Sequence, residues 1–100
     1  MAHQIPQEIA TDIGPLLSQL AKLGYEATGS LYDSKSFGNY YVDLVFDKNW
    51  LRIVRDRSQY SVDVASKEQL REAGMLRAFE DRGAFERAVL EWLPRSLTSA

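Results

Sequence analysis

The stretch that most constrains the fold of this chain runs from Ser36 to Asp63, where apolar and polar residues alternate with a period of two. Alternation of this kind over a short run is typical of a β-strand with one buried face. Three such runs follow one another with short polar segments between them: Tyr40–Phe46, Trp50–Arg55 and Ser61–Ala65. The stretch therefore predicts three consecutive antiparallel strands whose apolar residues share one core.

The register of these strands is constrained as well, because a slip of one residue would turn every side chain to the opposite face of the sheet. The expected pairs are Leu44 with Ile53, Phe46 with Leu51, Ile53 with Val62 and Leu51 with Val64, with turn tips at 48–49 and 57–58. This register places Arg52 opposite Asp63 and diagonal to Asp43 on the solvent side of the sheet. We name the surrounding set the Arg52 patch; it consists of Tyr41, Asp43, Trp50, Arg52 and Asp63.

A helix is predicted before the sheet, because isoleucine and leucine recur at helical spacing from Ile13 to Leu23. Asp12 is the expected N-cap of this helix, since aspartate accepts hydrogen bonds from the free N–H groups of a first turn. Pro15 then falls within the first turn, where its missing N–H costs nothing. Gly24 supplies the expected C-terminal stop.

Two further regions complete the predicted domain. Tyr25–Tyr32 is a weak, glycine-containing strand that we expect at the edge of the sheet. After the sheet, a capping box of the type S-x-x-Q begins at Ser66 and opens a helical segment that Gly74 divides. A last helix is expected over residues 84–93, ended by Pro94.

Together these segments predict an α+β fold: an N-terminal helix, a four-stranded antiparallel β-meander, and two or three short C-terminal helices. The length of 100 residues fits one domain spanning residues 1–100, with 1–11 and 95–100 expected to be loose. The chain has no cysteine, no signal-like N-terminus and no apolar run of the roughly 20 residues that span a bilayer. We therefore expect a cytoplasmic, unanchored protein without disulfides.

Most catalytic chemistries find no support in the sequence. His3 is the only histidine, and it lies at the N-terminus, where nothing fixes its geometry. The glycines are isolated and form no phosphate-binding loop, so no cofactor is expected. One enzymatic alternative stays open, because Glu26, Asp43 and Asp63 carry the oxygen ligands that Mg²⁺ prefers. Their spacing matches no known metal motif well, and we expect neither a metal nor an enzyme.

Recognition of another protein fits the residue types better. Tyrosine, tryptophan and arginine contribute most of the binding energy at protein interfaces. The net charge of −2 is too mild to indicate nucleic acid or a membrane, but residues 1–49 carry three lysines against six acidic residues. The expected partner-binding residues are Phe37, Asn39, Tyr41, Asp43, Trp50, Arg52 and Asp63.

A resemblance supports this interpretation. The segments LLSQLAKLGYE, YDSKSFGN and LRIVRDRSQYSVDV occur in this order and cover about half of the chain. They resemble a set of small, mostly uncharacterised bacterial proteins, some of which are similar to immunity proteins of toxin systems. The resemblance points to Phe37, Gly38, Asn39, Arg52, Arg55, Asp56, Arg57, Gln59 and Asp63.

Part of that set has a structural explanation. Arg55 falls on the inward side of its strand, where its stem could pack under Tyr60 and its guanidinium could bond a helix C-terminus or Asp33. Asp56 and Gln59 flank a turn. We therefore interpret Gly38, Arg55, Asp56, Arg57 and Gln59 as a structural motif.

The function expected from the sequence is that of a non-enzymatic protein-binding domain, most concretely a bacterial immunity protein that binds and occludes a cognate toxin. Acidic groups in the first half would then complement a basic active site. Two alternatives remain: a small metal-dependent enzyme using sheet carboxylates, and an adaptor or self-assembly module that associates through the edge strand Tyr25–Tyr32. We expect a monomer or weak dimer that binds neither nucleic acid nor membrane.

Overall fold

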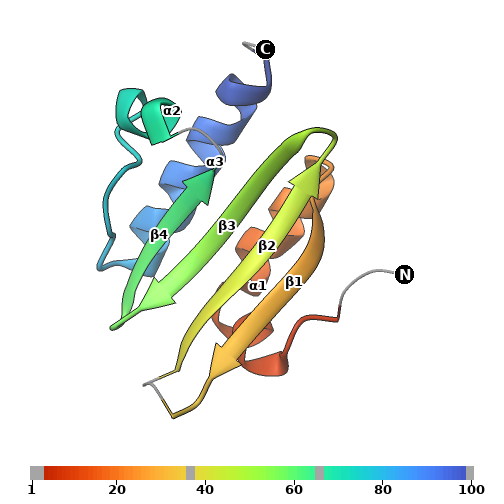
Figure 1. The fold of residues 1–100 in the computed structure, drawn as a ribbon, viewed down its shortest axis with the longest axis vertical. Coiled ribbons are helices and arrows are strands. Elements are labelled where there is room, and N and C mark those ends of the chain that lie inside the picture. Colours follow the sequence, from red (N-terminus) through yellow and green to blue (C-terminus); the bar gives the residue numbers. More distant parts are fainter. Residues whose placement is uncertain (1–3, 36–37, 65–66, 99–100) are drawn as a thin grey trace.

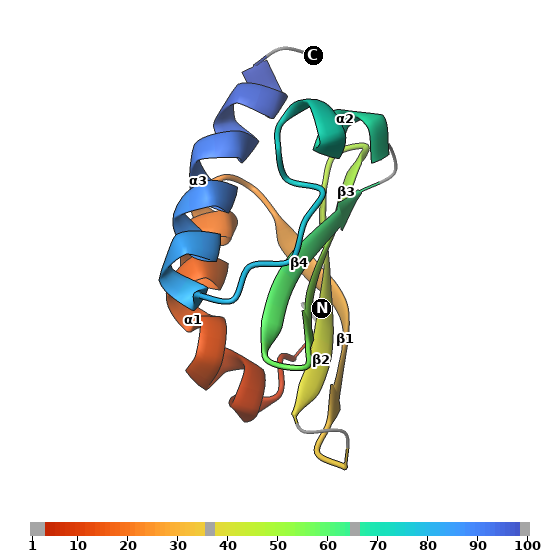
Figure 2. The same ribbon diagram turned by 90° about the vertical axis from the view of Figure 1, so that its left-hand side faces the viewer.

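A computed structural model describes residues 4–35, 38–64 and 67–98 of the chain. It confirms the predicted α+β fold, with one sheet and helices before and after it (Figure 1). The elements are α1 (Gln7–Lys22), β1 (Glu26–Asp33), β2 (Asn39–Phe46), β3 (Asn49–Asp56), β4 (Gln59–Val64), α2 (Lys67–Glu72) and α3 (Arg82–Thr98). Figure 2 shows α1 and α3 on the same side of the sheet, and none of the helices in the described residues lies over its other face. The domain therefore has two layers.

The strands form an antiparallel meander in the order β1-β2-β3-β4. In the β3–β4 hairpin the predicted register is confirmed: Leu51 faces Val64, Ile53 faces Val62, and the tip is Arg57-Ser58. Arg57 and Ser58 have φ values of 54° and 65°. Two consecutive residues with positive φ match the twist of a two-residue hairpin turn, although glycine usually supplies at least one of them.

The predicted register of the β2–β3 hairpin was wrong. The observed pairs are Val42 with Ile53, Leu44 with Leu51 and Phe46 with Asn49. The partner of Leu44 is thus two residues from the expected one, which preserves the assignment of every side chain to its face. The turn lies at Asp47-Lys48, where Asp47 has a φ of 55°, a conformation that aspartate tolerates better than most residues. Because neither turn contains a glycine, the sequence did not distinguish a tip at 47–48 from one at 48–49.

Helix α1 begins earlier than predicted. It starts at Gln7 after Pro6, which has no side-chain capping bond, and Asp12 lies inside the helix instead of capping it. The helix is kinked at Ile13, with φ −121° and ψ 23°. Pro15 explains the kink, because its ring lacks an N–H and crowds the carbonyl one turn before it. The helix ends at Lys22 beside Gly24, close to the predicted stop.

The core lies between the inner face of the sheet and the two long helices. Its members include Ile9, Ile13, Leu16 and Leu20 of α1, Val42, Leu44, Leu51, Ile53 and Val62 of the sheet, and Phe85, Val89, Trp92 and Leu93 of α3. All of them are at most 8% exposed. The alternation in the strands and the helical spacing in α1 and α3 therefore converge on one apolar layer.

The segment between α2 and α3 departs from the prediction. Gly74, at φ 73°, follows the end of α2, but residues 75–79 do not form the expected second helical piece. Instead, the backbone N–H of Phe79 donates to the carbonyl of Tyr60 at 2.7 Å and its carbonyl accepts from Tyr60 N–H at 2.8 Å. Phe79 thus lies along β4 like a one-residue strand. Helix α3 continues through Pro94 to Thr98, and Ser66 lies outside the described residues.

Candidate functional site

The side of the sheet that no described helix covers is the candidate site, and we name it the outer face (Figure 2). Residues opposite one another in adjacent strands share a face, so the pairing defines its members. They are Glu26, Gly29, Leu31, Asp33, Asn39, Tyr41, Asp43, Val45, Trp50, Arg52, Val54, Asp56, Gln59, Ser61 and Asp63. Five of these residues are carboxylates and one is an arginine. Since the whole chain carries only −2, acidic charge is concentrated on this face.

Asp43 and Arg52 form a two-pronged ion pair at the centre of the outer face. The Nε of Arg52 donates to Oδ1 of Asp43 at 2.6 Å, and its Nη2 donates to Oδ2 at 3.0 Å. The hydrogen bond to Asp43 raises the pKa of Arg52 further above its usual range. The guanidinium carbon also lies 4.2 Å from the ring centroid of Tyr41 and 5.7 Å from that of Trp50. Arg52 is therefore held in one orientation by three neighbours.

The Arg52 patch is brought together as predicted, with one correction. Asp43 lies directly opposite Arg52, where we expected it on the diagonal, because the β2–β3 register is shifted. Asp63 also lies opposite Arg52, in the neighbouring strand, as predicted. Both prongs of Arg52 go to Asp43, and Asp63 makes no ion pair with any described residue. The patch thus presents a neutralised pair with a second carboxylate, Asp63, beside it.

Replacing Arg52 by alanine should lower the free energy of unfolding by about 0.5–1 kcal/mol at low salt. The loss arises because Asp43 and Asp63 then flank β3 with no cation between them, and it should shrink as salt screens the repulsion. Urea denaturation at low and high ionic strength measures it. Arg71→Ala is the control, since Arg71 pairs with Glu68 on an exposed helix, at 66% and 68% side-chain exposure. Equal stability of both variants at low salt would contradict the expectation.

Asn39, one of the predicted partner-binding residues, makes two side-chain hydrogen bonds within the protein. Its side-chain amide donates to Oδ1 of Asp56 at 3.0 Å, and its side-chain oxygen accepts from the backbone N–H of Arg57 at 3.0 Å. Asp56 pairs with Gln59 to close the β3–β4 turn. These bonds attach the start of β2 to that turn. Phe37, the other predicted residue of this turn, lies outside the described residues.

Gly38 and Arg55 support each other on the inner side. The carbonyl of Gly38 accepts from Nη1 of Arg55 at 3.2 Å. Gly38 has a φ of 74°, and a Cβ there would lie 3.2 Å from the same Nη1. A side chain at this position would therefore strain the backbone and crowd the guanidinium. The inward orientation predicted for Arg55 is confirmed, with its guanidinium carbon 5.8 Å from the Tyr60 ring centroid.

Asp12 is the centre of a polar network that the sequence reasoning missed. Its Oδ2 accepts hydrogen bonds from the hydroxyls of Tyr40 at 2.7 Å and Tyr60 at 2.8 Å. Nη1 of Arg82 lies 3.3 Å from Oδ1 and 3.1 Å from the Asp12 carbonyl. Nε of Arg55 lies 3.8 Å from Oδ2, so Arg55 faces Asp12 instead of Asp33 or a helix C-terminus. The network joins α1, β2, β3, β4 and α3.

The signal for this network was present in the helical spacing. Asp12 is three residues after Ile9 and four before Leu16, both of which are buried. A helix that starts at Gln7 places Asp12 on the same face as these residues. The prediction made Asp12 the N-cap, which placed it outside the helix, so its position on this buried face was not recognised.

The electrostatics of the network indicate a structural role. Burial alone would raise the pKa of Asp12, but hydrogen bonds from Tyr40, Tyr60 and Arg82 and the charge of Arg55 together lower it. Burial and the bond to Asp12 raise the pKa of Tyr40 and of Tyr60. The carboxylate of Asp12 is thus kept charged. The phenols of Tyr40 and Tyr60 are kept neutral, and their protons are donated in hydrogen bonds to Asp12. Groups in that state hold elements together and are poorly suited to accept or release protons.

The alternative of a metal site gains no geometric support. Among residues 4–35, 38–64 and 67–98, no cluster of three or more acidic, histidine or cysteine side chains is arranged to hold a metal ion. Both carboxylate oxygens of Asp43 are bonded to Arg52. Asp43 would have to release that pair before it could act as a ligand.

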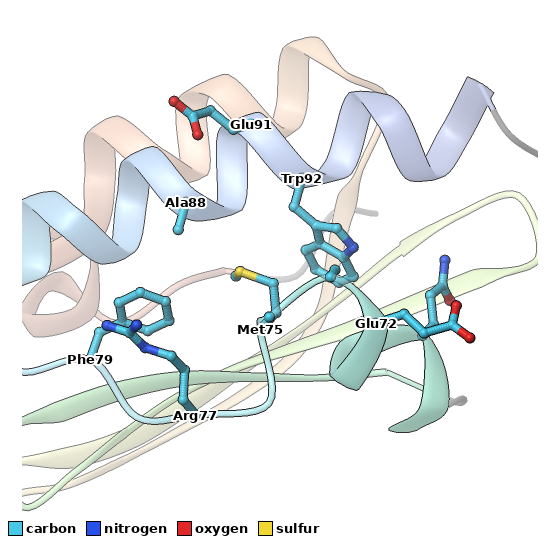
Figure 3. A pocket seen from close by; sticks show the side chains of 10 residues that line it. Glu72, Met75, Arg77, Phe79, Ala88, Glu91 and Trp92 are labelled. Atoms are coloured by element: carbon cyan, nitrogen blue, oxygen red, sulfur yellow. The ribbon is translucent and has the colours of Figure 1, made fainter.

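A second concave region lies between α2, residues 73–79 and α3 (Figure 3). It encloses about 610 Å³ and was not anticipated from the sequence. Met75, Phe79 and Trp92 form its apolar floor, but they are only 3%, 6% and 8% exposed. Arg77 lies over the Phe79 ring, with its guanidinium carbon 4.1 Å from the centroid. Because the floor is already covered, a ligand in this groove would bury little additional apolar surface.

The outer face has a smaller hollow of its own. It measures about 300 Å³ and is lined in part by Leu31, Tyr41, Arg52 and Val54. Apolar and aromatic groups beside a fixed guanidinium can receive a side chain of a partner protein. The hollow therefore gives the outer face a recess beside Arg52.

The described parts of the chain contain no helix that has both the length and the apolar character needed to span a membrane. Comparison with family models, with curated proteins and with solved structures found no match to this chain.

Proposed function

We propose that this chain is a non-enzymatic protein-binding domain whose outer face binds a basic surface of a partner protein in the cytoplasm. In its most concrete form, it is a bacterial immunity protein that binds a cognate toxin and occludes its active site. The observation that carries the proposal is the outer face, which combines five carboxylates, one arginine and two aromatic side chains on an uncovered sheet.

The Arg52 patch has the properties of an interface centre. Tyr41, Trp50 and Arg52 belong to the residue types that most often act as binding hot spots. Arg52 is already oriented by Asp43 and Tyr41, so little conformational entropy remains to be lost when a partner binds. The β-strands that carry these residues are fixed by the core beneath them. The groove beside α3 offers no comparable set of exposed anchors.

The charge of the outer face supports a basic partner. Glu26, Asp33, Asp56 and Asp63 surround the neutralised Asp43–Arg52 pair. The negative electrostatic potential of such a face accelerates association with a basic surface and disfavours binding of acidic proteins. Proteins that bind nucleic acids commonly present basic surfaces to the phosphates, so a toxin of that type would fit this surface.

Co-expression with the product of the neighbouring gene tests the proposal. We expect the two proteins to purify as one complex, and we expect toxicity of the partner in the host cell to be relieved when this chain is present. A matched variant in which Asp43, Asp63 and Trp50 are replaced by alanine should relieve toxicity less, at equal expression. Absence of both a complex and relief of toxicity would refute the proposal.

A further inference from the structure

The hollow on the outer face has an apolar part. It is lined by Leu31, Tyr41 and Val54, which are neighbours across β1, β2 and β3. Leu31 is 54% exposed, so it offers apolar surface that a partner can still bury. The volume of about 300 Å³ lies at the lower end of the range of about 300–1,000 Å³ that is usual for small-molecule pockets. The hollow is therefore sized for one side chain of a partner.

Two carboxylates line the same hollow. Asp33 of β1 pairs with Asn39 of β2 in the sheet, and the side-chain amide of Asn39 donates to Oδ1 of Asp56 on β3 at 3.0 Å. The backbone N–H of Lys35 donates to Oδ1 of Asp33, also at 3.0 Å. No basic side chain of the residues that the structure describes forms an ion pair with either carboxylate. This part of the hollow is therefore negative.

The two arginines that line the hollow do not cancel this charge, because each faces another aspartate. Arg52 is held by both oxygens of Asp43, at 2.6 and 3.0 Å. The Nε of Arg55 lies 3.8 Å from Oδ2 of Asp12. Both guanidinium charges are thus neutralised from outside the hollow, and the two remaining carboxylates favour a basic ligand.

We propose that this hollow receives an arginine side chain of the partner protein, an inference that rests on the binding role proposed for the outer face. The methylene groups of that arginine lie against Leu31, Tyr41 and Val54. Its guanidinium reaches Asp33 and Asp56. Long basic side chains commonly bury their apolar stems while the charged end stays near water, and the two parts of the hollow match that division.

The separation of the two carboxylates favours arginine over lysine. Neighbouring strands lie about 4.8 Å apart, so the backbones of Asp33 on β1 and Asp56 on β3 are about 10 Å apart. A guanidinium has five N–H donors that point in several directions within one plane, so it can donate to two carboxylates at once. The ammonium group of lysine is a compact, strongly hydrated charge, and moving toward one carboxylate takes it away from the other.

Titration of the chain alone with N-butylguanidinium, followed by amide NMR spectra, tests the assignment. This probe carries the alkyl stem and the charged group of an arginine. We expect saturable shifts of the backbone signals of Leu31, Tyr41 and Val54, with a dissociation constant on the order of 1–10 mM. N-butylammonium should bind about threefold more weakly, because it has fewer donors. Pentanoate, which combines a similar stem with a negative charge, should cause no saturable shifts.

A double variant tests the carboxylates. Asp33→Asn combined with Asp56→Asn removes both charges but keeps the oxygen acceptors of their internal hydrogen bonds. It should weaken binding of N-butylguanidinium about tenfold. The control is Glu68→Gln combined with Glu72→Gln, which removes two exposed carboxylates from α2 and should leave the binding unchanged.

A single variant tests the apolar part. Leu31→Ala should weaken binding of the probe about threefold, because the stem then buries less apolar surface. Leu76→Ala, at another exposed leucine, should bind the probe like the parent chain.

Three outcomes would overturn the inference. These are the absence of saturable shifts at the apolar residues, equal or tighter binding of N-butylammonium or pentanoate, and unchanged binding in the asparagine double variant with the parent fold. The titration contains no partner, so it is independent of the co-expression test. A complex that forms although the hollow does not bind the probe would refute this inference alone. Probe binding without any complex or relief of toxicity would refute the proposed function alone.

Discussion

Replacing Asp12 by alanine is expected to lower the free energy of unfolding by about 3 kcal/mol at neutral pH, since it leaves buried hydroxyls without an acceptor. The carboxylate accepts from Tyr40 and Tyr60 and lies within 4 Å of atoms of Arg55 and Arg82. Asp12→Asn retains an oxygen acceptor but removes the charge, so it should cost less than the alanine variant. Urea denaturation monitored by circular dichroism measures both.

The pH dependence provides a second measure of the same network. The pKa of Asp12 in the folded chain lies below its ordinary value of 3.8. Its stabilising contribution is therefore complete above that value and is lost as the pH falls through the lower, folded value. The stability difference between the parent chain and Asp12→Asn should be largest near neutral pH and should shrink below about pH 4.

Glu68→Gln is the control for Asp12→Asn, because it removes an exposed carboxylate that pairs with Arg71 on the surface of α2. Its stability should differ little from that of the parent chain at either pH. A loss of under about 1 kcal/mol in Asp12→Ala would show that the network contributes no more than a surface contact.

Trp50→Ala is expected to weaken binding of the partner by about 30-fold or more, corresponding to about 2 kcal/mol. Trp50 lies opposite Val45 on the outer face, and its ring borders the guanidinium of Arg52. Removing it would take away an aromatic contact area and would expose Arg52 to solvent. Surface plasmon resonance with the partner that co-purifies would measure the affinity and the rates, and the change should appear mainly in the dissociation rate.

Asp63→Lys is the matched electrostatic variant. Asp63 is an outer-face carboxylate opposite Arg52, so reversing its charge should mainly slow association at low salt and should reduce the salt dependence of the rate. Leu76→Ala alters an exposed residue away from the outer face and should bind normally. Unchanged affinity in both Trp50→Ala and Asp63→Lys would place the interface elsewhere on the protein.

The alternating pattern of the strands was sufficient to predict the sheet, its strand order and the faces of its residues. It also predicted that Arg52 would lie among carboxylates, because any pairing that buries Leu44, Leu51 and Ile53 together brings it there. The pattern was not sufficient for the β2–β3 register, since a shift of two residues leaves every side chain on its face. Turn chemistry would have decided between these registers, and neither candidate turn contains glycine.

The contacts between residues far apart in the sequence were the least predictable. The bonds from Tyr60 and Arg82 to Asp12 span 48 and 70 positions in the sequence, and no local pattern encodes such a distance. Similarly, helical spacing around Phe79 suggested a helix, but pairing of its backbone with β4 determined its conformation. Propensity is a local quantity, and tertiary hydrogen bonds override it.

Because inward and outward residues alternate along each strand, substitutions on the two faces of the sheet have different effects. Inward residues such as Val42 and Ile53 are fully buried, so their replacement alters the core. Outward residues such as Val45, Trp50 and Val54 contribute little to it, and surface substitutions usually change stability by about 0.5 kcal/mol or less. Recognition could therefore diversify residue by residue on one side of the sheet while the scaffold stays the same. In a domain of this design, substitutions on the outer face can compensate for changes in the surface of a partner, and the fold stays the same.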